Sequence, residues 1–269
     1  MKAPEVTISV VSHEHGEEIP HFLSDLAAFA SASVSEVIVT LNVPEGQLSQ
    51  WIEAREWPFK LTIIKNKAPL GYGANHNQAF GYCSSKYFCV VNPDIRLPRD
   101  PFPSLIKEFD NRSVGCVYPL HMNGDRVPRN HSREIPSLRA LFRRYGIKNH
   151  RKTPSGNEWV NGAFLLFPAE VYQELGGFDT KFFMYCEDVD ICLRLALSGY
   201  ILKVCQGTTV EHEARHASRR KVSHLLWHIE SLWVLWNSTV YREYKSKRAK
   251  GKLPIKFPDE EKYRLASRW

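Results

Sequence analysis

Two groups of acidic side chains carry the chemistry that this sequence can perform. In the first, Glu187, Asp188 and Asp190 stand within four positions, behind an aromatic run and ahead of an apparent helix. The second is the stretch NPD at 92–94, which directly follows the apolar run YFCVV. A carboxylate in one group can bind Mg²⁺ or Mn²⁺ on a diphosphate, while one in the other deprotonates an attacking hydroxyl. The two groups together predict metal-assisted transfer from a nucleoside diphosphate.

Each group also has a structural alternative. Asp190 stands four residues before Arg194, a spacing that suits a surface ion pair on a helix. Glu187 and Asp188 fall at the start of that helix, where negative charge is stabilised. The stretch 92–94 can be an Asx turn that ends a strand, with proline keeping the backbone extended. The catalytic interpretation is favoured because both groups fall on predicted strand-end loops of one sheet.

Alternating strands and helices must position these groups. The β-branched run at 5–12 predicts a buried strand, and helical spacing of apolar residues predicts a helix over 17–30. The alternation continues with strands at 36–41, 60–65, 87–91 and 159–167, helices at 47–56, 73–85 and 189–198, and a surface excursion at 121–158. This pattern predicts a doubly wound, mainly parallel α/β sheet with helices on both faces, in which ligands bind beyond the carboxyl ends of strands.

The chain changes character after residue 210. One helical face between 222 and 241 carries Leu225, Leu226, Ile229, Leu232, Trp233, Trp236 and Val240, and the basic tail KSKRAKGK follows at 245–252. We therefore predict a catalytic domain over 1–210 and a C-terminal helical segment over 211–269. This helix can pack on the core with a solvated end, or it can lie on an anionic membrane surface through its Trp, Lys and Arg side chains.

Composition limits the class of protein. A chain of 269 residues that is 43% hydrophobic can bury a sizeable core, and its net charge of +7 favours an anionic partner, whether nucleic acid, membrane or phosphorylated small molecule. The six cysteines form no CxxC pair, so we expect reduced core residues and no zinc site. The first apolar run is too short for a signal peptide, and no stretch is long enough to span a membrane, so we expect a cytoplasmic protein.

Several motifs, in matching order and spacing, make the chain resemble the inverting glycosyltransferases of family 2, which have the GT-A fold. It is most similar to the bacterial rhamnosyltransferases that build O-antigen on a polyprenyl diphosphate carrier. The resemblance covers nearly the whole chain. The motifs are VSHEH (11–15), GYGANHNQAF (71–80), VNPDI (91–95), VNGAFLLFP (160–168), GGFDTKFFMYCEDVDICLRLALSGY (176–200) and the His-rich segment from His212.

The resemblance implies a role for each matching residue. Asp94 would be the metal-binding end of the family's DxD-type motif, and His212 would approach the metal or the diphosphate. Asp188 would be the catalytic base, with Glu187 as its acidic neighbour. The positions that match the nucleotide-sugar pocket are Ser12, His13, Asn42, Gly73, Asn75, Asn92 and Arg219. His212 also has a structural alternative, because a lone histidine is more often part of the fold than a ligand.

One detail of the pocket differs from the family pattern, and the reason for one glycine stays open. Many family members carry Asp-Asn at the end of the second strand, but this chain has Leu41-Asn42 and so lacks a carboxylate often assigned to nucleoside recognition. Gly71 is explained equally well by turn chemistry, since glycine adopts backbone conformations that other residues avoid.

By resemblance, we expect an inverting, Mg²⁺- or Mn²⁺-dependent transferase that moves L-rhamnose from dTDP-rhamnose onto a lipid-linked saccharide. It would lie peripherally on the inner face of the bacterial cytoplasmic membrane. Three alternatives remain. The first is a family member that uses a UDP or GDP sugar. The second is a sugar-nucleotide pyrophosphorylase, although HEHGEE lacks the Gly-rich basic loop of such enzymes. The third is a nucleic-acid-binding module, although two acidic clusters would repel phosphates.

Overall fold

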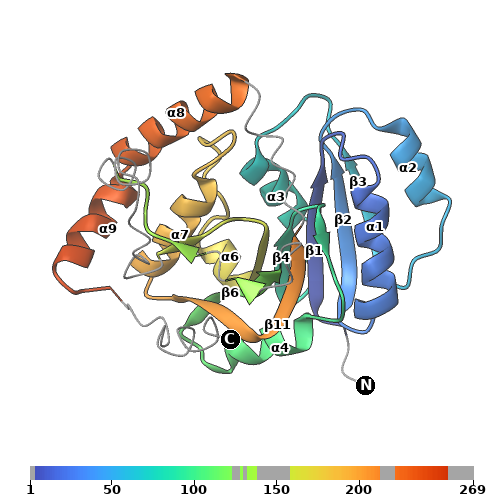
Figure 1. The fold of residues 1–269 in the computed structure, drawn as a ribbon, viewed down its shortest axis with the longest axis horizontal. Coiled ribbons are helices and arrows are strands. Elements are labelled where there is room, and N and C mark those ends of the chain that lie inside the picture. Colours follow the sequence, from blue (N-terminus) through green and yellow to red (C-terminus); the bar gives the residue numbers. More distant parts are fainter. Residues whose placement is uncertain (1–3, 123–127, 130–131, 138–157, 213–221, 254–269) are drawn as a thin grey trace.

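Strands and helices alternate through the first half of the chain, as the sequence predicts (Figure 1). The computed structural model describes residues 4–122, 128–129, 132–137, 158–212 and 222–253. The strands are β1 (Val6–Ser12), β2 (Val34–Leu41), β3 (Lys60–Lys65), β4 (Tyr87–Val91), β5 (Ile95–Arg96), β6 (Val114–Met122), β7 (Pro128–Arg129), β8 (Ser132–Arg133), β9 (Trp159–Val160), β10 (Phe164–Pro168) and β11 (Ile201–His212).

Helices follow most of the early strands, and α8 and α9 come after the last strand. They are α1 (Glu18–Asp25), which continues into a π-helical turn (Leu26–Ala30), α2 (Gly46–Glu53), α3 (Tyr72–Phe80), α4 (Phe102–Lys107), which continues into a 3-10 turn (Glu108–Asp110), α6 (Ala169–Glu174), α7 (Glu187–Leu197), α8 (Val222–Asn237) and α9 (Thr239–Ala249). In the described part of the chain, no helix has both the length and the apolar character that crossing a bilayer requires.

The main sheet is mixed in direction. Its order is β3-β2-β1-β4-β10-β6-β11-β5, and β7 pairs with β6. Strands β3, β2, β1 and β4 are parallel, whereas β10 runs antiparallel to both β4 and β6. Strand β11 is parallel to β6 and antiparallel to β5. The parallel half therefore places the ends of β2, β1 and β4 side by side.

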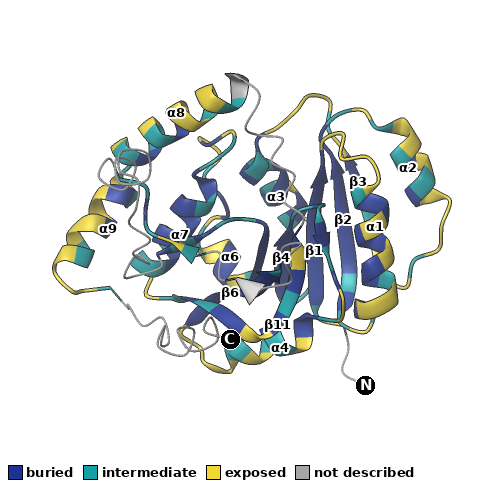
Figure 2. Cartoon of the chain, in the orientation of Figure 1, coloured by how far each residue is buried: buried dark blue, intermediate teal, exposed yellow. Residues whose placement is uncertain are grey.

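Helices cover both faces of the sheet because its central strands are apolar on both sides. Every residue of β1 is buried, which is typical of strands enclosed on both faces. In β2, Val37 and Val39 pack with α1, α2 and α4, whereas Ile38 packs on the opposite face with α3, α6 and α7. Buried positions therefore run through the middle of the molecule in Figure 2. The predicted doubly wound arrangement is confirmed.

Most predicted elements in the first 200 residues shift by a few residues at their ends, and two differ more. The strand expected over 159–167 is divided into β9 and β10, because the chain turns at Asn161–Ala163, where the carbonyl of Gly162 accepts a hydrogen bond from the hydroxyl of Tyr72. The helix expected over 73–85 ends at Phe80. Gly81 follows it and the next strand begins at Tyr87.

The C-terminal helix expected over 222–241 is two helices. Ser238 separates α8 from α9, and its hydroxyl accepts a hydrogen bond from the backbone N–H of Tyr241, which caps α9. Most of the expected basic tail therefore lies in α9 rather than after a helix. Leu235 and Tyr241 pack against α7, beside Leu193. Strand β11 runs to His212, across the predicted boundary at 210, and the division into two domains stays a prediction.

Candidate active site

The predicted site residues gather where parallel strands end. Ser12 is the last residue of β1, Asn42 follows β2, and Asn92 follows β4. These strands are neighbours in the sheet, so their end loops lie at one edge. In Figure 1 this edge is at the top, where α3 also begins. The sheet therefore assembles a site from segments that are far apart in the sequence, at the edge where ligands bind in such folds.

Asparagine side chains fix the turn that enters α3. The side-chain oxygen of Asn42 accepts hydrogen bonds from the backbone N–H of Leu70 and from the amide of Asn66, at 2.8 and 2.9 Å. The amide of Asn66 also donates to Asn75, whose own amide donates to the carbonyls of Leu70 and Gly71. Asn42 and Asn75 thus order the pocket's turn, and whether either contacts a nucleotide stays a prediction.

The reason for glycine at two positions of this turn is close packing. A Cβ on Gly71 would lie 2.5 Å from the carbonyl oxygen of Phe183, and one on Gly73 would lie 2.5 Å from the Cβ of Phe178. Gly71 has φ −65°, which any residue adopts, so the turn-chemistry explanation for Gly71 is wrong. The nucleotide-binding role of Gly73 stays a prediction.

A carboxylate that was not among the predicted site residues lies beside Ser12. The hydroxyl of Ser12 donates to Oε2 of Glu45 at 2.9 Å. Oε1 of Glu45 is buried and has no hydrogen-bond partner among the described residues. His13 is exposed nearby, and its Nδ1 lies 3.3 Å from the amide of Asn42. Glu45 thus brings negative charge to the end of β2, where Leu41-Asn42 lacks it, and its place just after that strand was the signal in the sequence.

Backbone pairing brings the predicted metal residues together. Strands β5 and β11 pair antiparallel with Ile95 opposite His212, so Asp94 lies next to His212. Nε2 of His212 is 3.3 Å from Oδ2 of Asp94. Oδ1 of Asp94 is buried and lacks a hydrogen-bond partner among the described residues. His121, which was not predicted, is fully buried with its Nδ1 3.3 Å from Nδ1 of His212.

A divalent cation fits this pair. The described residues contain no group of three or more His, Cys, Asp or Glu side chains that could enclose a metal. Asp94 and His212 would therefore leave several coordination positions to water and substrate, as is common where Mg²⁺ bridges a substrate's phosphates. The fit to a cation is supported by Oδ1 of Asp94, which is buried without a hydrogen-bond partner among the described residues, because buried carboxylate oxygens normally have partners.

The second acidic group begins α7 after a strained turn. Tyr185 and Cys186 have φ of 74° and 64°, a left-handed conformation that side chains other than glycine rarely adopt. This turn places Glu187 and Asp188 in the first turn of the helix. Oδ1 of Asp188 accepts a hydrogen bond from the N–H of Val189 at 2.8 Å, and Oδ2 accepts one from Gly162 at 3.3 Å. Asp188 is thus oriented from two directions.

Burial separates the roles of these two carboxyl groups. Asp188 keeps part of its surface exposed, but the dense surroundings raise its pKa to about 6. Burial, followed by repulsion from Asp188, raises the pKa of Glu187 well above its usual value. Oε2 of Glu187 is buried without a partner among the described residues. With a pKa of about 6, Asp188 is ionised at neutral pH and able to accept a proton, whereas the raised pKa of Glu187 favours its protonated form.

Tyr72 joins the two acidic groups. Its hydroxyl lies 2.7 Å from the carbonyl of Gly162 and 3.2 Å from Oδ1 of Asn92. The N–H of Gly162 in turn donates to Asp188, so Tyr72 links the stretch that holds Asp94 with the residue that orients Asp188. Burial, and then the nearby carboxylates, raise the pKa of Tyr72 well above its usual range, so it stays a neutral donor. The sequence did not reveal this role of Tyr72, because Tyr72 and Gly162 are 90 residues apart in the chain.

Comparison with known proteins decides the family. Residues 7–186 match the model of Glycosyl transferase family 2. The chain belongs to this family. It is 29% identical over 246 residues to rhamnosyltransferase WbbL of Escherichia coli (strain K12), across 84% of this chain and 90% of the relative. It is 24% identical over 259 residues to N-acetylglucosaminyl-diphospho-decaprenol L-rhamnosyltransferase of Mycobacterium tuberculosis (strain ATCC 25618 / H37Rv), across 84% and 82% of the two chains.

The fold of this glycosyltransferase agrees with solved structures. The mannosyltransferase PcManGT of Pyrobaculum calidifontis, solved in complex with GDP-Man and Mn²⁺, superposes with a TM-score of 0.59 at 17% identity. The match covers 85% of this chain but only 61% of the mannosyltransferase. This likeness concerns the fold alone. The GT-A fold that the resemblance implies is confirmed.

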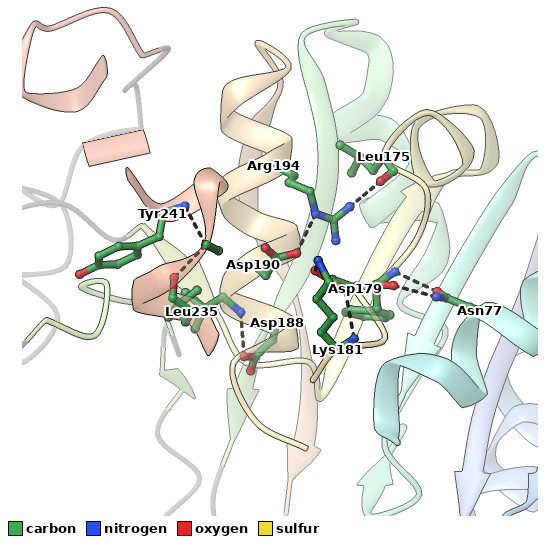
Figure 3. Close-up of polar contacts among 12 residues, drawn as sticks. Asn77, Leu175, Asp179, Lys181, Asp188, Asp190, Arg194, Leu235 and Tyr241 are labelled. Atoms are coloured by element: carbon green, nitrogen blue, oxygen red, sulfur yellow. Dashed lines mark hydrogen bonds and ion pairs between the residues drawn. The ribbon is translucent and has the colours of Figure 1, made fainter. Parts of the chain in front are cut away.

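The predicted ion pair on α7 has a clear outcome in the glycosyltransferase. Asp190 forms the expected ion pair with Arg194, at 2.7 Å, but the expectation of a surface pair is wrong because Asp190 is buried. Figure 3 shows Arg194 reaching from Asp190 to the carbonyl of Leu175, while Asp188 lies nearer the start of the helix. Arg219 lies outside the described residues.

Proposed function

We propose that this family 2 glycosyltransferase is inverting and transfers L-rhamnose from dTDP-rhamnose onto a GlcNAc-type lipid-linked saccharide, during synthesis of O-antigen or another surface polysaccharide. The observation that supports the mechanism is the Asp188 carboxylate, set at a helix start and joined through Gly162 and Tyr72 to the segment of Asp94. The names of relatives that match over most of their length support rhamnose as the sugar.

The reaction is a single displacement. The acceptor hydroxyl attacks the anomeric carbon from the face opposite the diphosphate, a new carbon–oxygen bond forms, and the bond to the diphosphate breaks. Asp188 takes the hydroxyl proton, since it is ionised at neutral pH and its pKa of about 6 is near the working pH. The N–H groups of Val189 and Gly162 hold its carboxylate in place. Burial and the neighbouring Asp188 raise the pKa of Glu187, which favours its protonated form and reduces the repulsion between the two adjacent carboxyl groups.

Asp94 and His212 would hold Mg²⁺ or Mn²⁺. When bound, the cation supplies positive charge that stabilises the departing nucleoside diphosphate. Asn92 positions this segment, because its backbone N–H donates to the carbonyl of Ala163 and its side chain receives the Tyr72 hydroxyl. Arg219 would add a charged donor for the phosphates. Because the proposed acceptor carries a lipid, the protein would lie peripherally at the inner face of the cytoplasmic membrane.

A donor panel tests this function. The purified chain is incubated with dTDP-rhamnose, UDP-GlcNAc, UDP-galactose or GDP-mannose, a synthetic GlcNAc-diphosphate-lipid acceptor, and Mg²⁺ or Mn²⁺, and products are identified by mass. We expect a deoxyhexose from dTDP-rhamnose alone, with no product after EDTA. Transfer from another donor would overturn rhamnose but keep the mechanism. No transfer from any donor, together with no nucleotide binding in thermal-shift titrations, would overturn the proposal.

A further inference from the structure

Helix α8 exposes a stripe of large apolar side chains. Leu225, Leu226, Ile229 and Trp233 are 61%, 60%, 57% and 69% exposed. At about 100° per residue, these four positions lie within about 100° of one another around the helix. We call these four residues the α8 stripe. In Figure 2, exposed positions recur along the ribbon of α8.

The α8 stripe differs from the other exposed apolar residues. In the described parts of the chain, eight large apolar side chains are exposed, and four of them form the stripe. The other four are spread along the sequence, at Phe29, Leu70, Tyr82 and Phe183. Single exposed apolar residues are ordinary, but a contiguous group marks an interaction surface. The stripe therefore needs a partner.

The opposite side of α8 is fixed to the segment that leads to the catalytic base. The hydroxyl of Ser231 donates to the carbonyl of Met184 at 2.8 Å, and the rings of Trp227 and Phe183 lie 5.2 Å apart. Leu235 is fully buried against the core. The stripe is therefore the outer face of a helix that is already packed, and α8 presents it in a fixed orientation.

Positive charge lies on the helix that follows α8. Helix α9 and the turn after it expose Arg242, Lys245, Lys250 and Lys252. In Figure 1, α8 and α9 form one outer margin of the molecule, and α8 lies at the same edge as the carboxyl ends of β1 and β2. An apolar stripe beside basic side chains matches the interface of an anionic bilayer. A second copy of this chain would instead bring its own basic helix close and be repelled.

We propose that the α8 stripe docks into the headgroup region of an anionic phospholipid bilayer, with the basic side chains of α9 on the lipid phosphates. The inference rests on the proposed function only for the biological role of docking, which is to bring the site to the acceptor. A docked α8 would hold the site's edge of the sheet towards the membrane that carries the acceptor, and would attach directly to the residues just before Asp188.

Vesicle binding tests the proposal without any turnover. The full chain is sedimented with vesicles of phosphatidylcholine, and with vesicles in which phosphatidylglycerol replaces part of it. We expect binding to the anionic vesicles that weakens as salt is added. Leu226→Ser with Trp233→Ser should lower the partition coefficient at least about 10-fold, because each buried CH₂ contributes strongly to insertion. The matched control, Phe29→Ser with Tyr82→Ser, removes two exposed apolar side chains elsewhere and should stay within about 2-fold.

Tryptophan fluorescence tests whether the α8 stripe itself enters the bilayer. Brominated lipids should quench tryptophan fluorescence of the wild type, and Trp233→Phe, which keeps an apolar ring, should lose most of that quenching while still binding. Equal binding by the stripe variant and the wild type, or no binding to anionic vesicles, would overturn the docking surface. So would a wild-type dimer in sedimentation that the stripe variant abolishes, because the stripe would then cover a second copy.

The failure of docking and the failure of the proposed function are distinguishable. Transfer to a short-chain, water-soluble acceptor, measured on the same preparations, reports on the catalytic site without a membrane. If that transfer proceeds while vesicles are not bound, docking is wrong and the function stands. If vesicles are bound through the stripe while no donor supports transfer, the function is wrong and docking stands.

Discussion

Replacing Asp188 with asparagine should abolish activity and stabilise the fold at neutral pH. The folded protein raises the pKa of Asp188 from its usual 3.8 to about 6, because burial disfavours its charge. A carboxyl whose pKa is raised on folding contributes stability that is present below its unfolded pKa and is lost as the pH rises through about 6. Asparagine is neutral at every pH, so the variant escapes this loss.

The size of the gain follows from the shift. A rise from 3.8 to about 6 is about two pKa units, which corresponds to at most about 3 kcal/mol. Two effects reduce it. Asp188 is partly exposed, so solvent screens its charge, and an asparagine amide facing Gly162 would lose the hydrogen bond from that N–H. We expect a gain of about 1–2 kcal/mol near pH 8, which disappears at about pH 4.

Thermal unfolding near pH 8 and pH 4 measures the gain, and initial rates measure activity. The rate of the variant should fall about 10²–10⁴-fold, the usual contribution of a general base. The wild-type kcat/KM should fall about tenfold for each pH unit below about 6. The control is Asp190→Asn in the same helix. It breaks the buried pair with Arg194 but leaves Asp188 in place, so its rate should stay within about tenfold of the wild type.

Two results would refute this reasoning about Asp188. If Asp188→Asn unfolds at a lower temperature than the wild type at pH 8, burial does not destabilise the ionised carboxyl. If the folded variant keeps near-wild-type turnover, Asp188 is not the base. Activity of the wild type that is unchanged from pH 8 down to pH 5 would also contradict a base with a pKa of about 6.

Three further substitutions probe the rest of the site. Tyr72→Phe removes the hydroxyl that reaches Gly162 and Asn92, so kcat should fall about tenfold with a loss of about 1 kcal/mol in stability, while calorimetry shows unchanged donor affinity. Asp94→Asn should weaken Mn²⁺ binding at least about tenfold in paramagnetic resonance titrations with nucleoside diphosphate, and unchanged binding would contradict the metal assignment. Glu45→Gln should weaken nucleoside diphosphate binding about tenfold by calorimetry with kcat retained; equal affinity would exclude Glu45 from the pocket.

The sequence predicts the parts of this fold that depend on local pattern. The run at 5–12 is β-branched, and its strand forms with every residue buried, because such side chains fit a sheet enclosed on both faces. The resemblance also predicts that Asp94 and His212 lie near each other, since it assigns both to one metal site. What brings them within 3.3 Å is the register of β5 on β11, which periodicity does not reveal.

The sequence fails where a distant segment decides. Periodicity placed Leu225 and Val240 on one face of one helix, whereas Ser238 ends α8 and Val240 lies in α9. Ser238 followed by Thr239 was the available signal, since serine is a preferred N-cap. Gly71 looked like a turn residue because its true constraint, the carbonyl of Phe183, is more than a hundred residues away.

The segment before Asp188 contacts both the turn that enters α3 and helix α8. Tyr185 and Cys186 hold left-handed backbone conformations, which cost about 1 kcal/mol or more each and persist only when their surroundings impose them. On one side, the N–H of Tyr72 donates to the carbonyl of Phe183. On the other, Ser231 of α8 donates to Met184. The position of Asp188 therefore depends on contacts made by α3 and by α8, the helix that we propose to lie on the membrane.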